Sequence, residues 1–591
     1  MSSSFPNFLT PNAARGLAGL LVVAVVAVYA NSFGGPFVFD DALSIVENPS
    51  IRQLWPLTAV LSPPSGQGIT VEGRPLVNLS FALNYAISGQ APWSYHAVNL
   101  AIHTLAALTL FGLVRRTLES RRTPSAGLVA FSAALLWAVH PLQTESVTYL
   151  AQRTESLMGL CLLATLYFFQ RQQFFWSCLA CLLGMATKEV MVVAPLLVVL
   201  YDRTFVAGSF RAGWARHRNY YLALASTWLL LAFLVLGAGN RGGTIGSAAG
   251  VTPWDYALCQ ARAVLHYARL ALWPSPLIFD YGQDFVPLAA AAPYLAVNLL
   301  LLAATGYALR HRPALGFLGA WYFLILAPTS SFVGGTRQML AEHRIYLSLA
   351  ALTVLAALAA QRTLGRRWWL APLLAATALG AATIQRNTDY ASALNLYRAT
   401  VAQRPGNGFA RYNLGLAYAE ADRHAEAIPE FAAAARLLPQ APAVPYNLGN
   451  SLVALARPAE AEAAFTTALH LNPHYAKAHF NLGNLLLARR DLAGAREHFR
   501  TVVALEPADL AARQNLGGVY LELGQPAAAG EHLVVVAQAQ PEAFEAHFGL
   551  GNAYLLLGRH EEAAREFETV LRLRPDLALA RERLQLARSA H

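Results

Sequence analysis

Two adjacent carboxylates, Asp40 and Asp41, follow the first apolar run of the sequence. If residues 16–30 span a membrane, this pair lies where the chain leaves the bilayer. Ionisable groups at a membrane boundary are costly unless they are paired or used, so their position favours a functional site. A carboxylate there can accept a proton from an attacking hydroxyl group. The alternative is that the pair caps a turn or a short helix, as Asp side chains often do.

More polar clusters lie at the ends of later apolar runs. A lone histidine there can be a hydrogen-bonded interfacial residue, and Arg153 with Glu155 or Lys188 with Glu189 can be simple ion pairs. Because all these clusters are expected on one side of an apolar module, together they predict a single site. The candidate residues are Arg74, His96, His140, Glu145, Arg153, Glu155, Lys188, His343 and Arg344.

Composition places these clusters in a membrane protein. The 591 residues are 55% hydrophobic and only 13% charged, which is too apolar for an ordinary soluble protein. The net charge is +10, but of the 44 basic residues only Lys188 and Lys477 are lysines. The arginines lie largely between apolar runs, where membrane orientation explains them. We therefore expect no nucleic-acid partner.

The apolar runs predict a membrane module over residues 1–386. Arginine clusters fall on alternate connections, which predicts an inside N-terminus and eleven spans. Residues 253–273 are excluded from the count, because Gln260, Arg262 and His266 favour an interfacial or re-entrant helix. The runs after the first lie near 97–114, 125–141, 154–170, 173–187, 189–202, 219–238, 288–309, 313–330, 345–361 and 368–385.

A 34-residue repeat occupies the rest of the chain. Proline recurs at positions 405, 439, 473, 507, 541 and 575, and Leu-Gly recurs at the same place in each unit. These residues resemble tetratricopeptide repeats, in which Gly and Ala let two helices touch and Pro ends the second helix. We expect a connecting half repeat at 387–407, five repeats at 408–575 and a capping helix at 576–591.

An asparagine recurs on the first helix of four of these repeats. A side-chain amide offers both a donor and an acceptor, so the ladder could bind an extended peptide backbone without reading its sequence. The alternative is that Asn-Leu-Gly simply helps to pack the repeats. The ladder consists of Asn413, Asn447, Asn481 and Asn515.

The ordered motifs resemble one family over nearly the whole chain. They are Phe-Asp-Asp after the first run, Arg-Pro-Leu at 74–76, Tyr-His at 95–96, His-Pro with Glu145, Arg-x-Glu at 153–155, Lys-Glu at 188–189, a Phe-Asp-Tyr segment ending at 281, and Glu-His-Arg-x-Tyr at 342–346. This set is similar to the transmembrane and tetratricopeptide-repeat-containing O-mannosyltransferases and their bacterial relatives. The resemblance implies an all-α fold, in which a membrane module of the GT-C glycosyltransferase type precedes a repeat superhelix.

The same resemblance implies an activity and residue roles. Such proteins transfer a sugar, such as mannose, from a polyprenyl-phosphate carrier to Ser or Thr of a protein on the outer face. Asp40 is then expected as the catalytic base and Asp41 as the group that orients it, with Arg344, Arg153 and Lys188 on the donor phosphate. Sugar or acceptor contacts are expected from Arg74, His96, His140, Glu145, Glu155 and His343.

The remaining expectations concern cofactors, place and rival functions. No cofactor is expected beyond the lipid-linked sugar, and a divalent metal at the paired carboxylates is not predicted. The Arg-rich composition favours a bacterial inner membrane with periplasmic site and repeats, or the endoplasmic reticulum in a eukaryote. Two alternatives stay open: a non-enzymatic membrane scaffold that recruits protein partners, and a ligase or transporter of lipid-linked sugars or polymers.

Overall fold

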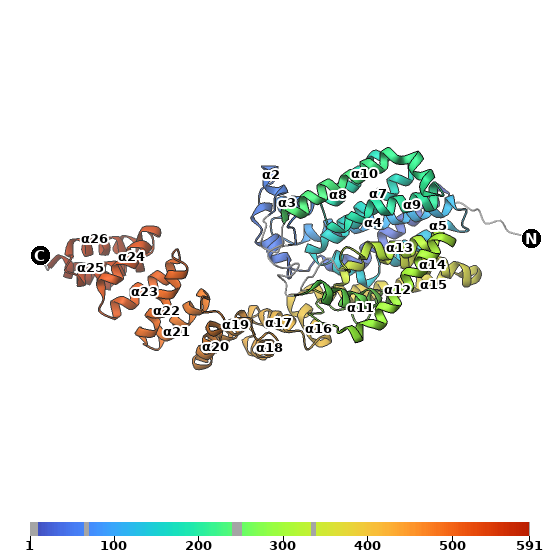
Figure 1. Cartoon of the computed structure of the whole chain (residues 1–591). Coiled ribbons are helices and arrows are strands. Elements are labelled where there is room, and N and C mark those ends of the chain that lie inside the picture. The colour runs from blue at the N-terminus through green and yellow to red at the C-terminus, as the bar shows by residue number, and fades with distance from the viewer. Residues whose placement is uncertain (1–9, 64–69, 239–250, 332–337, 590–591) are drawn as a thin grey trace, which may run out of the picture. The chain divides into compact units, whose positions relative to one another are not determined.

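The computed structural model describes residues 10–63, 70–238, 251–331 and 338–589. Within those ranges every regular element is a helix, which confirms the expected all-α fold (Figure 1). The chain divides into two compact units, residues 1–410 and residues 411–591. The first unit holds the apolar helices and the half repeat, and the second holds nearly all of the repeat array.

Four helices of the described chain are long and apolar enough to cross a membrane: α1 with its following turn (Pro11–Ser32), α4 (Trp93–Ser120), α10 (Phe210–Gly237 within the helix) and α12 (Leu288–His311). A fifth candidate is α5 (Ala126–Ala138) followed by Pro141–Val147, which are bent by 54°. These helices indicate a membrane protein. The count of eleven spans stays a prediction, because other apolar helices are shorter than the roughly 20 residues that a straight span needs.

The apolar runs nevertheless all form helices. Proline separates some of these helices, as at Pro313, which begins α13 directly after α12 ends. Besides α4, α5 and α12, they are α7 (Arg153–Gln170), α8 (Phe174–Met185), α9 (Ala194–Tyr201), α10 (Phe210–Ala238), α13 (Pro313–Leu326), α14 (Leu349–Thr363) and α15 (Leu370–Asn387).

Helix α11 (Pro253–Leu272) corresponds to the segment that we expected not to cross a membrane, and it is not one of the candidate spans. Its buried polar groups bind the chain around residue 340. The Gln260 side-chain amide donates to the Met339 carbonyl at 2.7 Å, and the Ala341 N–H donates to the Tyr267 hydroxyl at 3.1 Å. Gln260 and Tyr267 of α11 therefore hold the segment that leads into the Glu-His-Arg motif.

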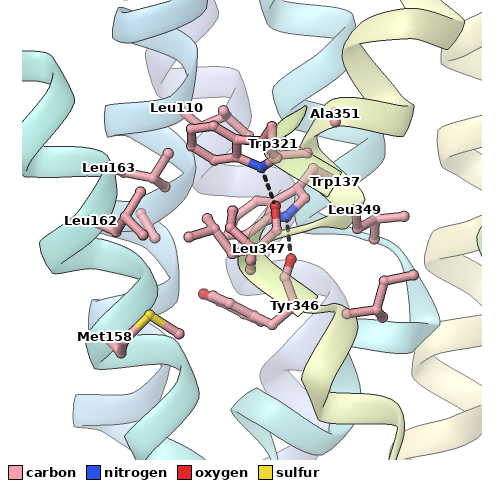
Figure 2. Close-up of a cluster of buried hydrophobic side chains, with 14 of the residues drawn as sticks. Leu110, Trp137, Met158, Leu162, Leu163, Trp321, Tyr346, Leu347, Leu349 and Ala351 are labelled. Carbon is pink, nitrogen blue, oxygen red and sulfur yellow. Dashed lines mark hydrogen bonds between the residues drawn. The ribbon is translucent and has the colours of Figure 1, made fainter. Parts of the chain in front are cut away.

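Two indole rings hold the far end of that motif in the core of the first unit. Figure 2 shows Trp137 of α5 donating to the Tyr346 carbonyl at 2.8 Å and Trp321 of α13 donating to the Leu347 carbonyl at 2.9 Å. All of these side chains are buried among leucines from α4 and α7. The chain directly after the short helical turn η10 (Glu342–Ile345) is thus fixed by two helices, α5 and α13.

The repeat array has the period that the sequence predicts. In each pair a glycine of the first helix lies against a large side chain of the second: a Cβ at Gly449 would come within 2.5 Å of the Phe465 ring. The pairs begin with α17 (Gly408–Glu420), α19 (Ala443–Ala454), α21 (Ala476–Ala488), α23 (Leu510–Glu522) and α25 (Phe544–Leu556), and continue with α18 (His424–Leu437), α20 (Pro458–Leu471), α22 (Leu492–Leu505), α24 (Pro526–Ala539) and α26 (His560–Leu573).

A helix lies at each end of the array, where the sequence predicts a half repeat and a cap, and the bounds of both stay predictions. Helix α16 (Ala393–Gln403) is the second helix of an incomplete repeat and belongs to the first unit. Helix α27 (Ala578–Ser589) follows the last repeat and packs through Ala580, Leu584 and Ala587. Residues 590–591 of the expected capping helix lie outside the described residues.

Two neighbouring glycines of α23 provide a matched test of this packing. A Cβ at Gly517 would lie 2.5 Å from Leu533 Cγ, whereas a Cβ at Gly518 meets nothing within 4 Å. We expect Gly517→Ala to destabilise the repeat unit by about 1–3 kcal/mol through overpacking. We expect Gly518→Ala to stabilise it by about 0.5–1 kcal/mol, because Ala loses less backbone entropy in a helix. Calorimetric unfolding of both variants checks this, and shifts of the same sign would contradict it.

Candidate functional site

The loop that carries the paired carboxylates is held by Asp41. This side chain is completely buried, and its two oxygens accept the backbone N–H groups of Val38 at 3.0 Å and Ala151 at 2.6 Å. Burial raises the pKa of Asp41 to about 8, against the effect of these donors. Asp41 therefore ties the loop to the turn before α7, whereas its side chain makes no cap to the short helix Ala42–Val46 that follows it.

Asp40, in contrast, stays partly accessible. Its carboxylate accepts the Thr70 hydroxyl at 3.1 Å and a hydrogen bond from the Tyr149 hydroxyl, whose oxygen also accepts the Asp40 N–H at 3.1 Å. Burial of the carboxylate raises its pKa, while these hydrogen bonds and the positive charge of Arg74 oppose the shift. The result is a carboxylate oriented by hydrogen bonds, in a residue that is only partly buried.

Two ion pairs join motifs that are far apart in sequence. Arg74 Nη2 lies 3.2 Å from Glu189 Oε2, and Lys188 Nζ lies 2.5 Å from Glu155 Oε1. The Lys188–Glu155 pair is buried, with side chains 7% and 3% exposed. Neighbouring residues in the sequence thus pair with different partners, so Arg153–Glu155 and Lys188–Glu189 are not the pairs that form.

Glu145 and His343 form a third buried pair. Both oxygens of Glu145 accept from His343, one from the backbone N–H at 2.9 Å and one from the ring Nδ1 at 2.7 Å. Burial and the nearby positive charges of Lys188, Arg344 and Arg74 lower the pKa of His343 well below its usual value. This environment favours the neutral form of the His343 ring.

Glu342, the first residue of the Glu-His-Arg motif, anchors another segment. Its Oε1 accepts the Ile278 N–H at 2.6 Å and the Tyr281 hydroxyl at 2.8 Å, and its Oε2 lies 3.8 Å from Arg386 Nη2. Burial raises the pKa of Glu342 to about 7. The charges of Glu145 and Arg386 act on Glu342, and that of Glu145 also acts on Asp40, so these motifs share one electrostatic environment.

The structure gives two of the expected phosphate ligands extensive protein contacts. Arg344 donates through Nη1 to the Tyr256 hydroxyl and the Met339 carbonyl and through Nη2 to the Gln338 carbonyl, at 2.9, 3.0 and 2.7 Å. Arg153 is completely buried and donates to acceptors on α3 (Pro75–Ser88) and α4. The acceptors of Arg153 include the Asn84 side chain at 2.7 Å and the Asn99 side chain at 2.6 Å. Their phosphate roles stay predictions.

The other two predicted histidines lie beside backbone carbonyls. His96 Nε2 is 3.0 Å from the Gly35 carbonyl, at the turn that leads into the Asp40 loop. His140 Nδ1 accepts the Leu142 N–H at 3.2 Å and its Nε2 is 3.2 Å from the Ala271 carbonyl. Both histidines position backbone here, and their sugar contacts stay predictions.

Several residues of this site were missed by sequence reasoning. Thr70 and Tyr149 bond to Asp40 itself, and Tyr281 and Arg386 surround Glu342. None of them is among the candidate residues predicted from the sequence. The one available signal was the Phe-Asp-Tyr segment, which contains Tyr281 but does not reveal its contact with Glu342.

The asparagine ladder lies beside a second column of amides. Asn481 Nδ2 donates to Asn450 Oδ1 at 2.7 Å, and Asn515 Nδ2 donates to Asn484 Oδ1 at 2.8 Å. Asn447 donates instead to the Tyr412 hydroxyl at 2.9 Å, and Asn413 also has a polar partner. A cavity of about 480 Å³ between α19 and α21 is lined by Asn450, Asn481, Asn484 and apolar neighbours. The arrangement offers amide oxygens and N–H groups to a ligand in the groove.

In the part of the chain that the structure describes, no group of three or more His, Cys, Asp or Glu side chains has the arrangement of a metal site. What the site offers is an accessible oriented carboxylate with arginine and lysine groups in the same electrostatic environment. Such a pair of features suits the transfer of a group between a hydroxyl and a phosphate.

Comparisons with known proteins identify relatives of both units. Residues 385–442, 446–509 and 515–578 match the tetratricopeptide repeat family. Protein O-mannosyl-transferase F38B6.6 of Caenorhabditis elegans is 27% identical over 427 residues, which cover 68% of this chain and 60% of the relative. The human protein O-mannosyl-transferase TMTC4 is 26% identical over 482 residues, 69% of this chain and 65% of the relative.

The matches thus span less than two thirds of the length of these relatives. Among solved structures, that of YrrB, a tetratricopeptide-repeat protein, is 20% identical, with a TM-score of 0.30 over 32% of this chain and 96% of that one.

Proposed function

Because this chain is a relative of the proteins named O-mannosyl-transferase TMTC and carries their kind of repeats, we propose that it is a membrane glycosyltransferase. It takes mannose from a polyprenyl-phosphate carrier and transfers it to Ser or Thr hydroxyls of acceptor proteins. The observation that carries the proposal is the contrast between the two carboxylates, since Asp41 holds the loop while Asp40 stays oriented and accessible.

Asp40 is the base in the proposed reaction. The acceptor hydroxyl oxygen attacks C1 of the mannose, the bond from C1 to the phosphate oxygen breaks, and the hydroxyl proton passes to the Asp40 carboxylate. The polyprenyl phosphate leaves with the bonding electron pair. A carboxylate with a raised pKa is a stronger base, so burial of Asp40 assists the proton transfer.

The leaving phosphate requires positive charge. Arg74 and Lys188 both have carboxylate partners, so each can contribute a cation while its own position is fixed. The positive charge of Arg344 also helps to lower the pKa of His343, so Arg344 contributes to the same electrostatic environment. We assign these three residues to the donor phosphate end and the Glu145–His343 pair to orientation of the sugar.

The pH dependence of transfer follows from Asp40. The base must be ionised, so the rate falls as pH drops through its pKa, and burial raises that pKa above the usual value of 3.8. We expect the acid limb of kcat/KM to have its midpoint above about pH 4. A profile measured between roughly pH 4 and pH 8 checks this. A rate that stays constant to the acid limit of folding would contradict it.

The repeats are proposed to hold the acceptor, with Asn481 and Asn515 bonding to its backbone. Replacing either with Ala should raise the acceptor KM about 5-fold, the equivalent of about 1 kcal/mol per hydrogen bond, and leave the donor KM unchanged. Gln540→Ala, an exposed amide after α24, is the matched control. Steady-state kinetics with each substrate varied in turn measure both constants. Equal effects of all three variants would contradict a specific ladder.

A donor comparison tests the proposed function. The purified chain is incubated with a pool of acceptor proteins and radiolabelled mannose. The mannose is carried either by polyprenyl phosphate or by a nucleoside diphosphate. We expect label in protein from the lipid donor alone. Label from the nucleotide donor alone would overturn the donor assignment, and label in a lipid-linked product instead of protein would favour a ligase.

For location we propose a bacterial inner membrane, with the site and the repeats in the periplasm. The Arg-rich, Lys-poor composition and the alternation of arginine clusters support this. In a eukaryotic cell the equivalent arrangement is the endoplasmic reticulum membrane with lumenal repeats. Accessibility of single introduced cysteines next to Asp40 and in the repeats would test the orientation.

A further inference from the structure

The loop of residues 278–284 lies against the Asp40 loop through a single ring. The Phe279 ring centroid is 5.7 Å from that of Phe39 and 5.5 Å from that of Tyr149, both edge to face. Phe39 directly precedes Asp40, and the Tyr149 hydroxyl is hydrogen-bonded to Asp40. Phe279 thus packs on Tyr149, which is bonded to Asp40, and on Phe39, which directly precedes it.

The same ring contacts the half repeat. Phe279 lies 6.0 Å from Tyr390 and 6.1 Å from Tyr397 of α16, measured between ring centroids and again edge to face. Phe279 is only 2% exposed, so all four rings close around it. Edge-to-face aromatic pairs contribute about 0.5–1.5 kcal/mol each beyond their buried area.

Neighbouring residues fasten the loop on both sides. The Ile278 N–H and the Tyr281 hydroxyl bind Glu342, as described above. On the other side, Asn407 Nδ2 donates to the Asp280 carbonyl at 3.0 Å, and the Arg404 guanidinium lies 5.4 Å from the centre of the Tyr281 ring. The loop is therefore fixed between the polar site and the start of the repeats.

The Asp40 loop needs such support because its backbone is strained. Phe39 has φ of +50°, a left-handed conformation that costs a non-glycine residue about 1–2 kcal/mol. The Phe39 side chain is 47% exposed, so burial of the ring supplies little compensation. Its contact with Phe279 is the aromatic packing that can hold this conformation.

We propose that Phe279 is a positioning residue, which fixes Asp40 through Phe39 and Tyr149 and links that carboxylate to the half repeat through Tyr397. The proposal rests on the proposed function for its kinetic consequence, though not for its structural one. Through the Phe-Asp-Tyr segment, the position of the Asp40 carboxylate depends on the position of α16.

The consequence for acidity has a definite sign. The charged and titratable groups that act on Asp40 are Arg74, Tyr149, Glu145 and the adjacent Asp41, and the hydrogen bond from Tyr149 lowers the Asp40 pKa. A smaller side chain at position 279 leaves Tyr149 without its packing partner, so this hydrogen bond weakens. The Asp40 pKa then rises, and the acid limb of the pH–rate profile moves to higher pH.

A pair of variants tests the kinetic consequence. We expect Phe279→Leu to lower kcat about 10-fold and to shift the acid limb upward, with an acceptor KM close to that of the wild type. Tyr149→Phe should produce the same shift, and the double variant should shift no further than either single one. A lower kcat with an unchanged pH profile, or additive shifts, would overturn the positioning role. Phe285→Leu, an exposed ring in the same connection, is the control.

Hydrogen exchange tests the structural consequence without any activity. Followed by mass spectrometry on the full chain in detergent, Phe279→Leu should accelerate exchange of residues 38–48, and Tyr397→Leu should accelerate it to a smaller degree. Phe285→Leu should leave exchange there unchanged. If the wild type transfers no sugar but exchange responds as expected, the proposed function fails and the positioning link stands. Unchanged exchange in Phe279→Leu overturns the link.

Discussion

Asp40→Asn is expected to lower kcat by about 10²–10⁴-fold without changing the unfolding midpoint, because the amide cannot accept the acceptor's proton. The substitution is nearly isosteric, and the Thr70 hydroxyl can still donate to the remaining side-chain oxygen. Single-turnover transfer from the lipid donor, measured beside calorimetric unfolding, separates the two effects.

Asp41→Asn is the matched control for that result. The amide nitrogen that replaces one oxygen cannot accept either the Val38 or the Ala151 N–H, so one buried donor loses its partner. That loss costs about 1–3 kcal/mol of stability. We therefore expect Asp41→Asn to lower the unfolding midpoint and Asp40→Asn to leave it alone. Full activity in Asp40→Asn, or equal destabilisation by both, would contradict the division of roles.

The second large effect concerns the buried pair of Glu155 and Lys188. Glu155→Gln leaves the Lys188 ammonium without its counter-charge in a site where both side chains are nearly inaccessible. Breaking a buried pair in this way typically costs about 3–5 kcal/mol. We expect a correspondingly lower unfolding midpoint and a lower yield of folded protein from the membrane.

Removing both charges should restore much of that stability. The double variant Glu155→Gln with Lys188→Met has no unpaired charge, and apolar replacements of buried pairs are often neutral. If Lys188 also serves the donor phosphate, the double variant will be stable yet show a raised donor KM. A double variant that is less stable than Glu155→Gln alone would contradict the pairing.

The repeats could be predicted in detail from the sequence because their packing is local. Gly449 contacts Phe465 sixteen residues later in the same unit. The same contact recurs along the array with a period of 34 residues. The family resemblance, drawn from ordered motifs, is confirmed by the relatives of this chain. Short motifs in a fixed order carry such information even where each alone is weak.

The pairing within the site could not be predicted, because its partners are distant in sequence. Lys188 pairs with Glu155 rather than with its neighbour Glu189, and His343 pairs with Glu145 almost two hundred residues earlier. Periodicity reports which face of a helix is buried, but it carries no information on which helices meet. The role of Tyr149, a single tyrosine after an unremarkable turn, follows only from that tertiary arrangement.

Sequence also could not separate ligands from supports. The sequence predicts Arg153 as a phosphate ligand at a membrane boundary. In the structure its guanidinium group donates to four acceptors on α3 and α4. The paired carboxylates divide in the same way, because Asp41 is buried and holds the loop to Ala151 while Asp40 is only partly buried. Both questions depend on burial of individual atoms, which neighbouring residues in three dimensions decide.

The most direct test of the central claim is the mass of a defined acceptor protein after incubation with polyprenyl-phosphate mannose. The account predicts addition of hexose to Ser or Thr by the wild-type chain, and its near absence with equally folded Asp40→Asn. Equal addition by both proteins would place the base elsewhere. No addition by the wild type, with any acceptor that its repeats bind, would contradict the enzyme and leave the scaffold interpretation.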